Sequence, residues 1–205
     1  MSGFIERGRR RPPGRQRRRA QGQTLVEFAL ILPLFMLVLT AVIEFGFLFN
    51  SFLAINFASR EASLVAAEAG NLARADCLIL NAIEQSVGSP SDPGLITQVD
   101  IYRADRAGNP TGSVTTYVRG GETSCDLPGG DTLKVPYLVG TDGYKPIDRC
   151  NRLAGCKPGQ VGVDQIGVKI TYLYGWHTPL GNLFGGTAGK TKLEKTNIMR
   201  MEPVL

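Results

Sequence analysis

The stretch Gly22–Phe49, GQTLVEFALILPLFMLVLTAVIEFGFLF, decides the fold of this chain. Sixteen uncharged residues, 28–43, follow Glu27 without interruption. The part from Leu25 to Phe49 has 25 residues, of which 17 are Leu, Ile, Val or Phe. As an α-helix it is about 37 Å long, which exceeds the ~30 Å hydrocarbon core of a bilayer. The sequence therefore predicts a membrane-spanning helix, which we assign to residues 23–49.

Charge predicts the orientation of this helix. Residues 1–22 contain eight of the 23 basic residues of the chain, all of them arginine, but only one of its 18 acidic residues. This basic leader therefore carries a net charge of +7, and the rest of the chain carries −2. The positive-inside rule keeps such a leader in the cytoplasm and exports residues 50–205. An arginine-rich tract can also bind nucleic acid, but beside a membrane span it is more typical of a topogenic signal, so we expect no nucleic-acid partner.

The exported part is long enough for one small domain with its own core. The chain continues from the span to about Ala69 without a helix breaker, and Gly70 then favours a helix end. A second, amphipathic helix is predicted over residues 76–87, with Asp76 as its N-cap. The predicted inward-facing residues of that second helix are Leu80, Ile83 and Val87.

From residue 88 onward, short β-prone runs alternate with turns rich in glycine and proline, a pattern typical of linked strands. The predicted strands are residues 96–103, 113–119, 132–139, 166–174 and 192–201. Alternation in the fourth strand places Val168, Ile170, Tyr172 and Tyr174 on one buried face. We therefore expect an α+β fold, in which a long N-terminal transmembrane helix continues into a head made of a second helix and an antiparallel sheet.

All four cysteines fall in the exported part, as expected where thiols can oxidise. Cys150 and Cys156 bracket a short loop and can form one disulfide, which leaves Cys77 and Cys125 for the other. The two alternative pairings remain open. A zinc site is the competing interpretation, but C-x5-C spacing and a lone His177 fit the usual ligand pattern poorly. We expect no metal, no cofactor and, with a single histidine, no enzymatic activity.

The sharpest local pattern joins Gly22 to Glu27, the fifth residue after it, and then to Phe28. Here the chain resembles a type IV prepilin. In that family a membrane-embedded peptidase cuts after the glycine, releases the basic leader and leaves the apolar helix with its glutamate fifth. The resemblance implies cleavage between Gly22 and Gln23.

Two longer segments make the resemblance more specific. QTLVEFALILPLF, which begins at Gln23, and IEFGFLFNSFLAINFASREAS, which begins at Ile43, are similar to the TadE-like family. These are minor pilins, or pseudopilins, of the tight-adherence (Tad or Flp) pilus system. The chain departs from the family pattern in having Ala62 and Ser63 where a Gly-Ala pair is common, and in its long cysteine-bearing middle.

The resemblance implies a function in assembling an adhesive pilus at the bacterial cytoplasmic membrane, which the chain would cross once. Its implied partners are the prepilin peptidase, other pilin or pseudopilin subunits, the Tad secretion machinery and the membrane. The alternative is a permanently anchored extracytoplasmic binding domain, for which the span is only a tether.

Helix geometry gives the spacing a physical meaning, because residues one and five of a helix share a face about 6 Å apart. After cleavage, Gln23 carries the new amine. An ammonium about 4 Å from the Glu27 carboxylate offsets the cost of placing that charge near lipid by roughly 4 kcal/mol at an effective dielectric of ~20. The amine can belong to the same chain or to a neighbouring subunit. Alternatively, Thr24 and Glu27 form the capping box of an ordinary transmembrane helix, and both interpretations can hold at once.

The expected subunit-packing residues are thus Glu27, Phe28 and Pro33. Pro33 removes one helix hydrogen bond and favours a kink, which can either help the helix bend during extraction or simply reflect how common proline is in membrane helices. Near the outer end of the span we expect Glu44 to be an interfacial carboxylate, with an interhelix contact as the alternative. An apolar loop late in the chain can lie on the membrane, on a pilin partner or in the core; its residues are Trp176, His177, Leu180, Leu183 and Phe184.

Overall fold

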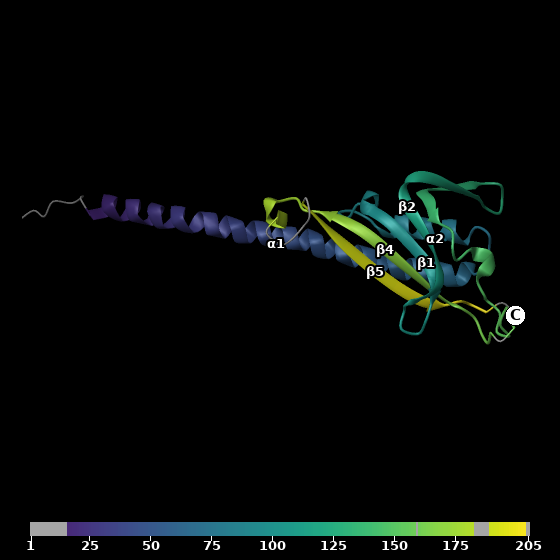
Figure 1. The fold of residues 1–205 in the computed structure, drawn as a ribbon. Coiled ribbons are helices and arrows are strands. Elements are labelled where there is room, and N and C mark those ends of the chain that lie inside the picture. Colours follow the sequence, from purple (N-terminus) through teal and green to yellow (C-terminus); the bar gives the residue numbers. More distant parts are fainter. Residues whose placement is uncertain (1–15, 159, 183–188, 204–205) are drawn as a thin grey trace, which may run out of the picture. The chain divides into compact units, whose positions relative to one another are not determined.

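The computed structural model describes residues 16–158, 160–182 and 189–203, and it confirms the α+β class (Figure 1). The chain divides into two compact units, Met1–Ile43 and Glu44–Leu205. Most of the basic leader lies outside the described residues. The helices are α1 (Gln16–Ala69) and α2 (Ala75–Ser86), with short 3-10 turns η1 (Pro93–Leu95), η2 (Pro146–Asp148) and η3 (Pro179–Asn182). The strands are β1 (Ile96–Ala104), β2 (Pro110–Asp126), β3 (Thr132–Thr141), β4 (Gln165–Gly175) and β5 (Lys190–Arg200).

Helix α1 ends where the sequence predicts. Gly70 adopts a left-handed conformation, with φ of 55°, and its N–H donates to the carbonyl of Ala66 at 3.2 Å. Glycine adopts this conformation without the steric cost that a Cβ atom brings. Asn151 also approaches this position, since a Cβ atom added at Gly70 would lie 2.9 Å from its side-chain nitrogen. The helix end is therefore fixed both by local conformation and by packing.

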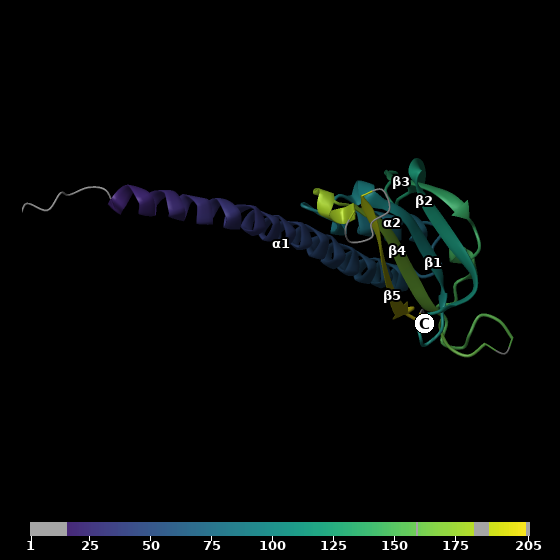
Figure 2. The same cartoon turned by 60° about the vertical axis from the view of Figure 1, so that its left-hand side comes forward.

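Five antiparallel strands form one sheet in the order β3-β2-β1-β4-β5 (Figure 2). Four of the predicted strands differ from the observed ones by at most two residues at either end. The second prediction was too short, because β2 continues past Gly120 and Gly121 to Asp126. The register between β2 and β3 shifts between Arg119 and Thr123, so an irregularity absorbs the two glycines without ending the strand.

The core lies between the helices and one face of the sheet. From α1 it takes Ile55 and the small residues Ala58, Ala62 and Ala66, which let the helix approach the strands closely. The predicted inward faces are confirmed: Leu80, Ile83 and Val87 are buried, as are Val168, Ile170, Tyr172 and Tyr174. Burying a large apolar side chain contributes roughly 1.5–3 kcal/mol, so each such residue of this core stabilises the head.

Asp76 does not cap α2 as predicted. Residue Arg74 precedes the helix without a side-chain capping bond, and Asp76 turns into the head. There it forms an ion pair with Arg149, whose side chain is fully buried, and accepts a hydrogen bond from the Tyr117 hydroxyl at 2.7 Å. A buried carboxylate needs such partners far more than a helix end needs one cap.

The two disulfides have the pairing that loop closure favoured. Cys77 of α2 joins Cys125 of β2 with a Cα–Cα distance of 6.3 Å, and Cys150 joins Cys156 at 5.6 Å. The first bond ties the second helix to the far end of the longest strand. Closing a 48-residue loop restricts the unfolded chain by about 4 kcal/mol in the chain-entropy picture.

Strand β5 runs beside the second half of α1 and is held to it by polar contacts. The side-chain amide of Asn197 donates to the hydroxyl of Ser59 at 2.6 Å, and just beyond the strand the N–H of Glu202 donates to the carbonyl of Ala67 at 3.1 Å. Near the start of the strand, Leu193 packs against the core. These contacts fix the face of β5 that looks toward the helix.

Candidate functional site

The predicted processing and packing residues lie on the N-terminal part of α1. Gly22, Gln23, Glu27, Phe28 and Pro33 are all exposed there, and Phe28 keeps 62% of its surface. The described helix from Gly22 to Ala69 is long and apolar enough to cross a membrane. No residue in its most apolar stretch is buried by the rest of the protein. An apolar surface without protein cover favours lipid or neighbouring helices. One such helix fits a single-pass anchor.

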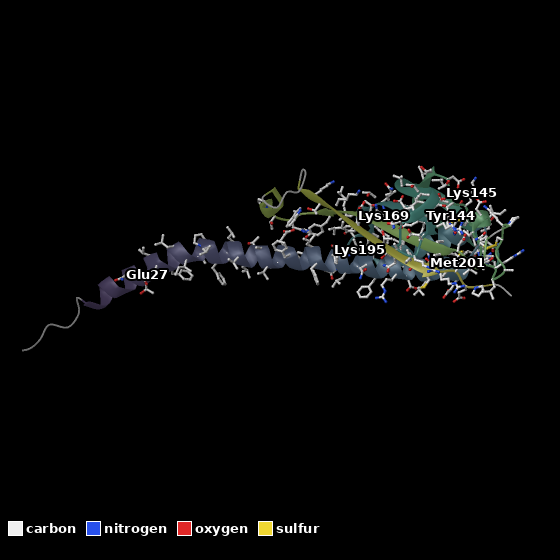
Figure 3. The ribbon with its side chains drawn as sticks, turned by 60° about the horizontal axis from the view of Figure 1, so that its bottom comes forward. Glu27, Tyr144, Lys145, Lys169, Lys195 and Met201 are labelled. Carbon is white, nitrogen blue, oxygen red and sulfur yellow. A yellow bond between two sulfur atoms is a disulfide. The ribbon has the colours of Figure 1, made fainter. Side chains whose placement is uncertain are left out.

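Gln23 and Glu27 meet on one face of the helix, where the side-chain amide of Gln23 donates to a carboxylate oxygen of Glu27 at 3.2 Å. Figure 3 labels Glu27 on this N-terminal part of α1. This contact follows from the four-residue spacing, which stacks side chains on successive turns. The Glu27 carboxylate therefore lies within hydrogen-bond distance of the Gln23 side chain.

The capping-box interpretation fails for the uncleaved chain. Helix α1 begins at Gln16 and passes through Gly22, so Thr24 lies in the third turn and not at a helix start. Thr24 and Glu27 can cap the helix only if the chain begins near Gln23.

Pro33 lies inside the same continuous helix and is exposed. It removes the hydrogen bond to the carbonyl of Ala29.

The hydroxyl within the apolar segment forms its hydrogen bond inside the helix. The Thr40 hydroxyl donates to the carbonyl of Met36 at 2.7 Å. Such back-bonding to the preceding turn is how a hydroxyl avoids an unsatisfied donor in lipid. Glu27 therefore stands out as the charged group of this exposed segment.

Glu44 behaves differently from the interfacial carboxylate we expected. Its side chain is 1% exposed and belongs to the head, whose compact unit begins at this residue. One carboxylate oxygen accepts hydrogen bonds from the Tyr174 hydroxyl at 3.0 Å and from the His177 backbone N–H at 2.9 Å. The Nδ1 atom of the His177 ring lies 3.5 Å from the same oxygen. The expectation was wrong because partners 130 residues away bury the carboxylate.

The local sequence explains how these donors reach Glu44. Alternation along β4 turns Tyr174 toward α1, and the strand ends at Gly175, after which the chain turns back over the helix. Burial, and then the hydrogen bond to Glu44, raise the pKa of the Tyr174 hydroxyl, so it stays a donor even above the pH at which an exposed tyrosine ionises. A hydrogen bond to a charged acceptor contributes about 1.5–3 kcal/mol. Glu44 thus fastens the segment after β4 to α1.

Aromatic rings surround this contact. Trp176 packs edge-on against Phe45 and Tyr174, with ring centroids 6.1 and 5.9 Å apart, and its indole N–H donates to the Thr191 hydroxyl at 2.7 Å. Phe47 lies 5.3 Å from the His177 ring. Of the predicted apolar loop, Trp176 and His177 therefore pack against α1, while Leu183 and Phe184 lie outside the described residues.

A family comparison covers both glutamates. The family model described as TadE-like protein matches residues 22–64. We call residues 22–64, which are similar to that family, the TadE-like segment. No curated protein and no solved structure matches the chain. The TadE-like segment contains Glu27, Pro33 and Glu44, whereas both disulfides lie outside it.

The head beyond the TadE-like segment contains a second polar cluster with a structural role. Asp164 accepts hydrogen bonds from the Tyr144 hydroxyl and the Cys150 N–H, both at 3.0 Å, and pairs with Arg103 at 2.9 Å. This cluster fixes the loop closed by Cys150 and Cys156. Among the described residues, no three His, Cys, Asp or Glu side chains lie together as metal ligands would.

Proposed function

We propose that this chain is a minor pilin, or pseudopilin, of a Tad/Flp-type system. A prepilin peptidase cuts it between Gly22 and Gln23, and the apolar part of α1 then packs among helices of other subunits. The head lies outside the cytoplasmic membrane and the basic leader inside. The match of residues 22–64 to the TadE-like family carries the proposal, and no enzymatic role is part of it.

The arrangement of Gln23 and Glu27 supports the proposed packing. The two side chains already meet at 3.2 Å on an exposed helix face. An amine created at residue 23 offers a counter-charge to a carboxylate at that position, either within the chain or from a neighbour. At about 4 Å the attraction is roughly 4 kcal/mol for an effective dielectric of ~20. Pairing with a neighbour fixes the axial register of adjacent helices.

The charge and cysteine distributions support the proposed topology. The basic leader precedes the span, and both disulfides lie in the unit that follows it. Disulfides persist in extracytoplasmic compartments, whereas cytoplasmic thiols are kept reduced. Both features favour a cytoplasmic N-terminus and an exported head.

A Glu27→Ala variant tests the proposal. We expect it to insert, since removing a charge lowers the cost of insertion by up to about 3.5 kcal/mol, but to fail in pilus assembly. Glu68→Ala is the matched control, because Glu68 is an exposed carboxylate on the same helix outside residues 22–64. Alkaline extraction of membranes measures insertion, and electron microscopy of cells measures pili. Normal pili with Glu27→Ala would favour the alternative, a tethered binding domain.

A further inference from the structure

An apolar groove lies in the head between α1 and the first half of β5. Its volume is about 500 Å³, within the ~300–1,000 Å³ typical of ligand sites. None of the described side chains that line it is charged or polar. The lining residues are Phe45, Gly46, Leu48, Phe49, Phe52 and Leu193.

Gly46 keeps this groove open. A Cβ atom added there would meet nothing within 4 Å, so the space above the helix backbone is free. Phe49 and Phe52 stack beside it with ring centroids 6.3 Å apart. A slender apolar chain can therefore lie along the helix between these rings and Leu193.

A lysine stands at one end of the groove. The Lys195 ammonium lies 3.7 Å from the centroid of the Phe52 ring, and Lys195 makes no ion pair within the described part of the chain (Figure 3). Lys192, by contrast, pairs with Glu194 at 2.6 Å. Residues 192 and 195 differ in parity along β5, so they project from opposite faces of the strand. Lys195 is thus a cation at the groove without a carboxylate.

The position of the groove along the helix indicates its occupant. Phe45 and Phe49 lie in the last turns of the predicted span, where acyl chains give way to phosphates. The apolar groove suits the acyl chain of a phospholipid, and the Lys195 ammonium, which has no ion-pair partner among the described residues, suits its phosphate. We propose that the groove binds one anionic phospholipid of the extracytoplasmic leaflet, with an acyl chain over Gly46 and its phosphate at Lys195. This site rests on the membrane insertion proposed above.

Labelling of the full-length protein in nanodiscs tests the site. The probe is a phosphatidylglycerol that carries a photoreactive diazirine in its acyl chain, and peptide mass spectrometry locates the adduct. We expect adducts on residues 45–52 and at Leu193. Gly46→Leu places a side chain in the groove, where its Cβ atom meets nothing within 4 Å, and should abolish them. Lys195→Gln removes one lysine near the lipid surface and should be labelled about fivefold less than the wild type. Lys192→Gln is the control on the other face of the strand and should be labelled like the wild type.

Equal labelling of wild type and Gly46→Leu would overturn the site, and so would groove residues that cross-link to a second copy of the chain instead of lipid. Native mass spectrometry of the wild type gives an answer that depends on no variant. It should show one retained phosphatidylglycerol in preference to phosphatidylcholine, and equal retention of both would contradict the proposal. A chain that does not enter nanodiscs contradicts the proposed insertion, whereas an inserted chain with an unlabelled groove contradicts only the lipid site.

Discussion

Replacing Glu44 by alanine should release the segment after β4 from α1. The change removes the carboxylate oxygen that accepts from Tyr174 and from the His177 backbone N–H, at 3.0 and 2.9 Å. Each bond to a charged acceptor contributes about 1.5–3 kcal/mol. Without the carboxylate the His177 N–H loses this acceptor, whereas the Tyr174 hydroxyl keeps only the backbone carbonyl of residue 44, at 3.5 Å. For the His177 amide alone this corresponds to roughly 10- to 150-fold faster hydrogen exchange, at 1.4 kcal/mol per factor of ten.

Hydrogen exchange of the full chain in detergent micelles measures this directly. Peptides that contain His177 should exchange fastest in Glu44→Ala, while Glu44→Gln, which keeps an acceptor oxygen, should lie between that variant and the wild type. Glu27→Gln is the control, because Glu27 lies on the same helix but belongs to the other compact unit, residues 1–43. If exchange at His177 is the same in the wild type and Glu44→Ala, the carboxylate does not hold this segment, and our account of Glu44 is wrong.

Three further predictions concern the stability of the head. Asp76→Ala should lower the free energy of unfolding by about 3–5 kcal/mol, because it leaves the buried Arg149 guanidinium without its counter-charge; a loss below about 1 kcal/mol in urea titration would contradict this. Removing the disulfide with a Cys77→Ala/Cys125→Ala double variant should cost about 4 kcal/mol, and an unchanged urea midpoint would show that the loop does not constrain the unfolded chain. Raising the pH above about 10 should unfold the head, because buried tyrosines with raised pKa values stay protonated when folded but ionise when unfolded. Above that pH, each such tyrosine should lower the free energy of unfolding by about 1.4 kcal/mol per pH unit. Circular dichroism against pH measures this, and a signal that stays constant to pH 12 would oppose it; the tyrosines are Tyr117, Tyr137, Tyr144 and Tyr174.

Local features of the sequence predicted most of the elements. The apolar run, the stop at Gly70 and the alternation in β4 depend on neighbouring residues, so they can be recognised without knowing the fold. The disulfide pairing was favoured by short-loop closure at Cys150 and Cys156. Strand β2 was cut short because Gly120 and Gly121 normally interrupt a strand, whereas here a register shift accommodates them.

Contacts between distant residues could not be predicted in this way. Asp76 has the residue type and the place of an N-cap, but its partner Arg149 lies 73 positions away. Glu44 likewise meets Tyr174 and His177 across 130 residues or more. One indirect signal for Glu44 was present in the sequence: a carboxylate in an apolar helix needs hydrogen-bond donors, and the side chains directly before and after it offer none. Which donors it finds depends on how the strands are ordered, and the sequence pattern does not reveal that order.

The proposed processing at Gly22 depends on one bond, and intact-mass analysis of the protein extracted from native membranes tests it most directly. With the cognate peptidase present, we predict a chain that begins at Gln23 and lacks the mass of residues 1–22. A chain that still begins at Met1 in assembled, functional material would contradict the proposal that this protein acts as a processed pilin.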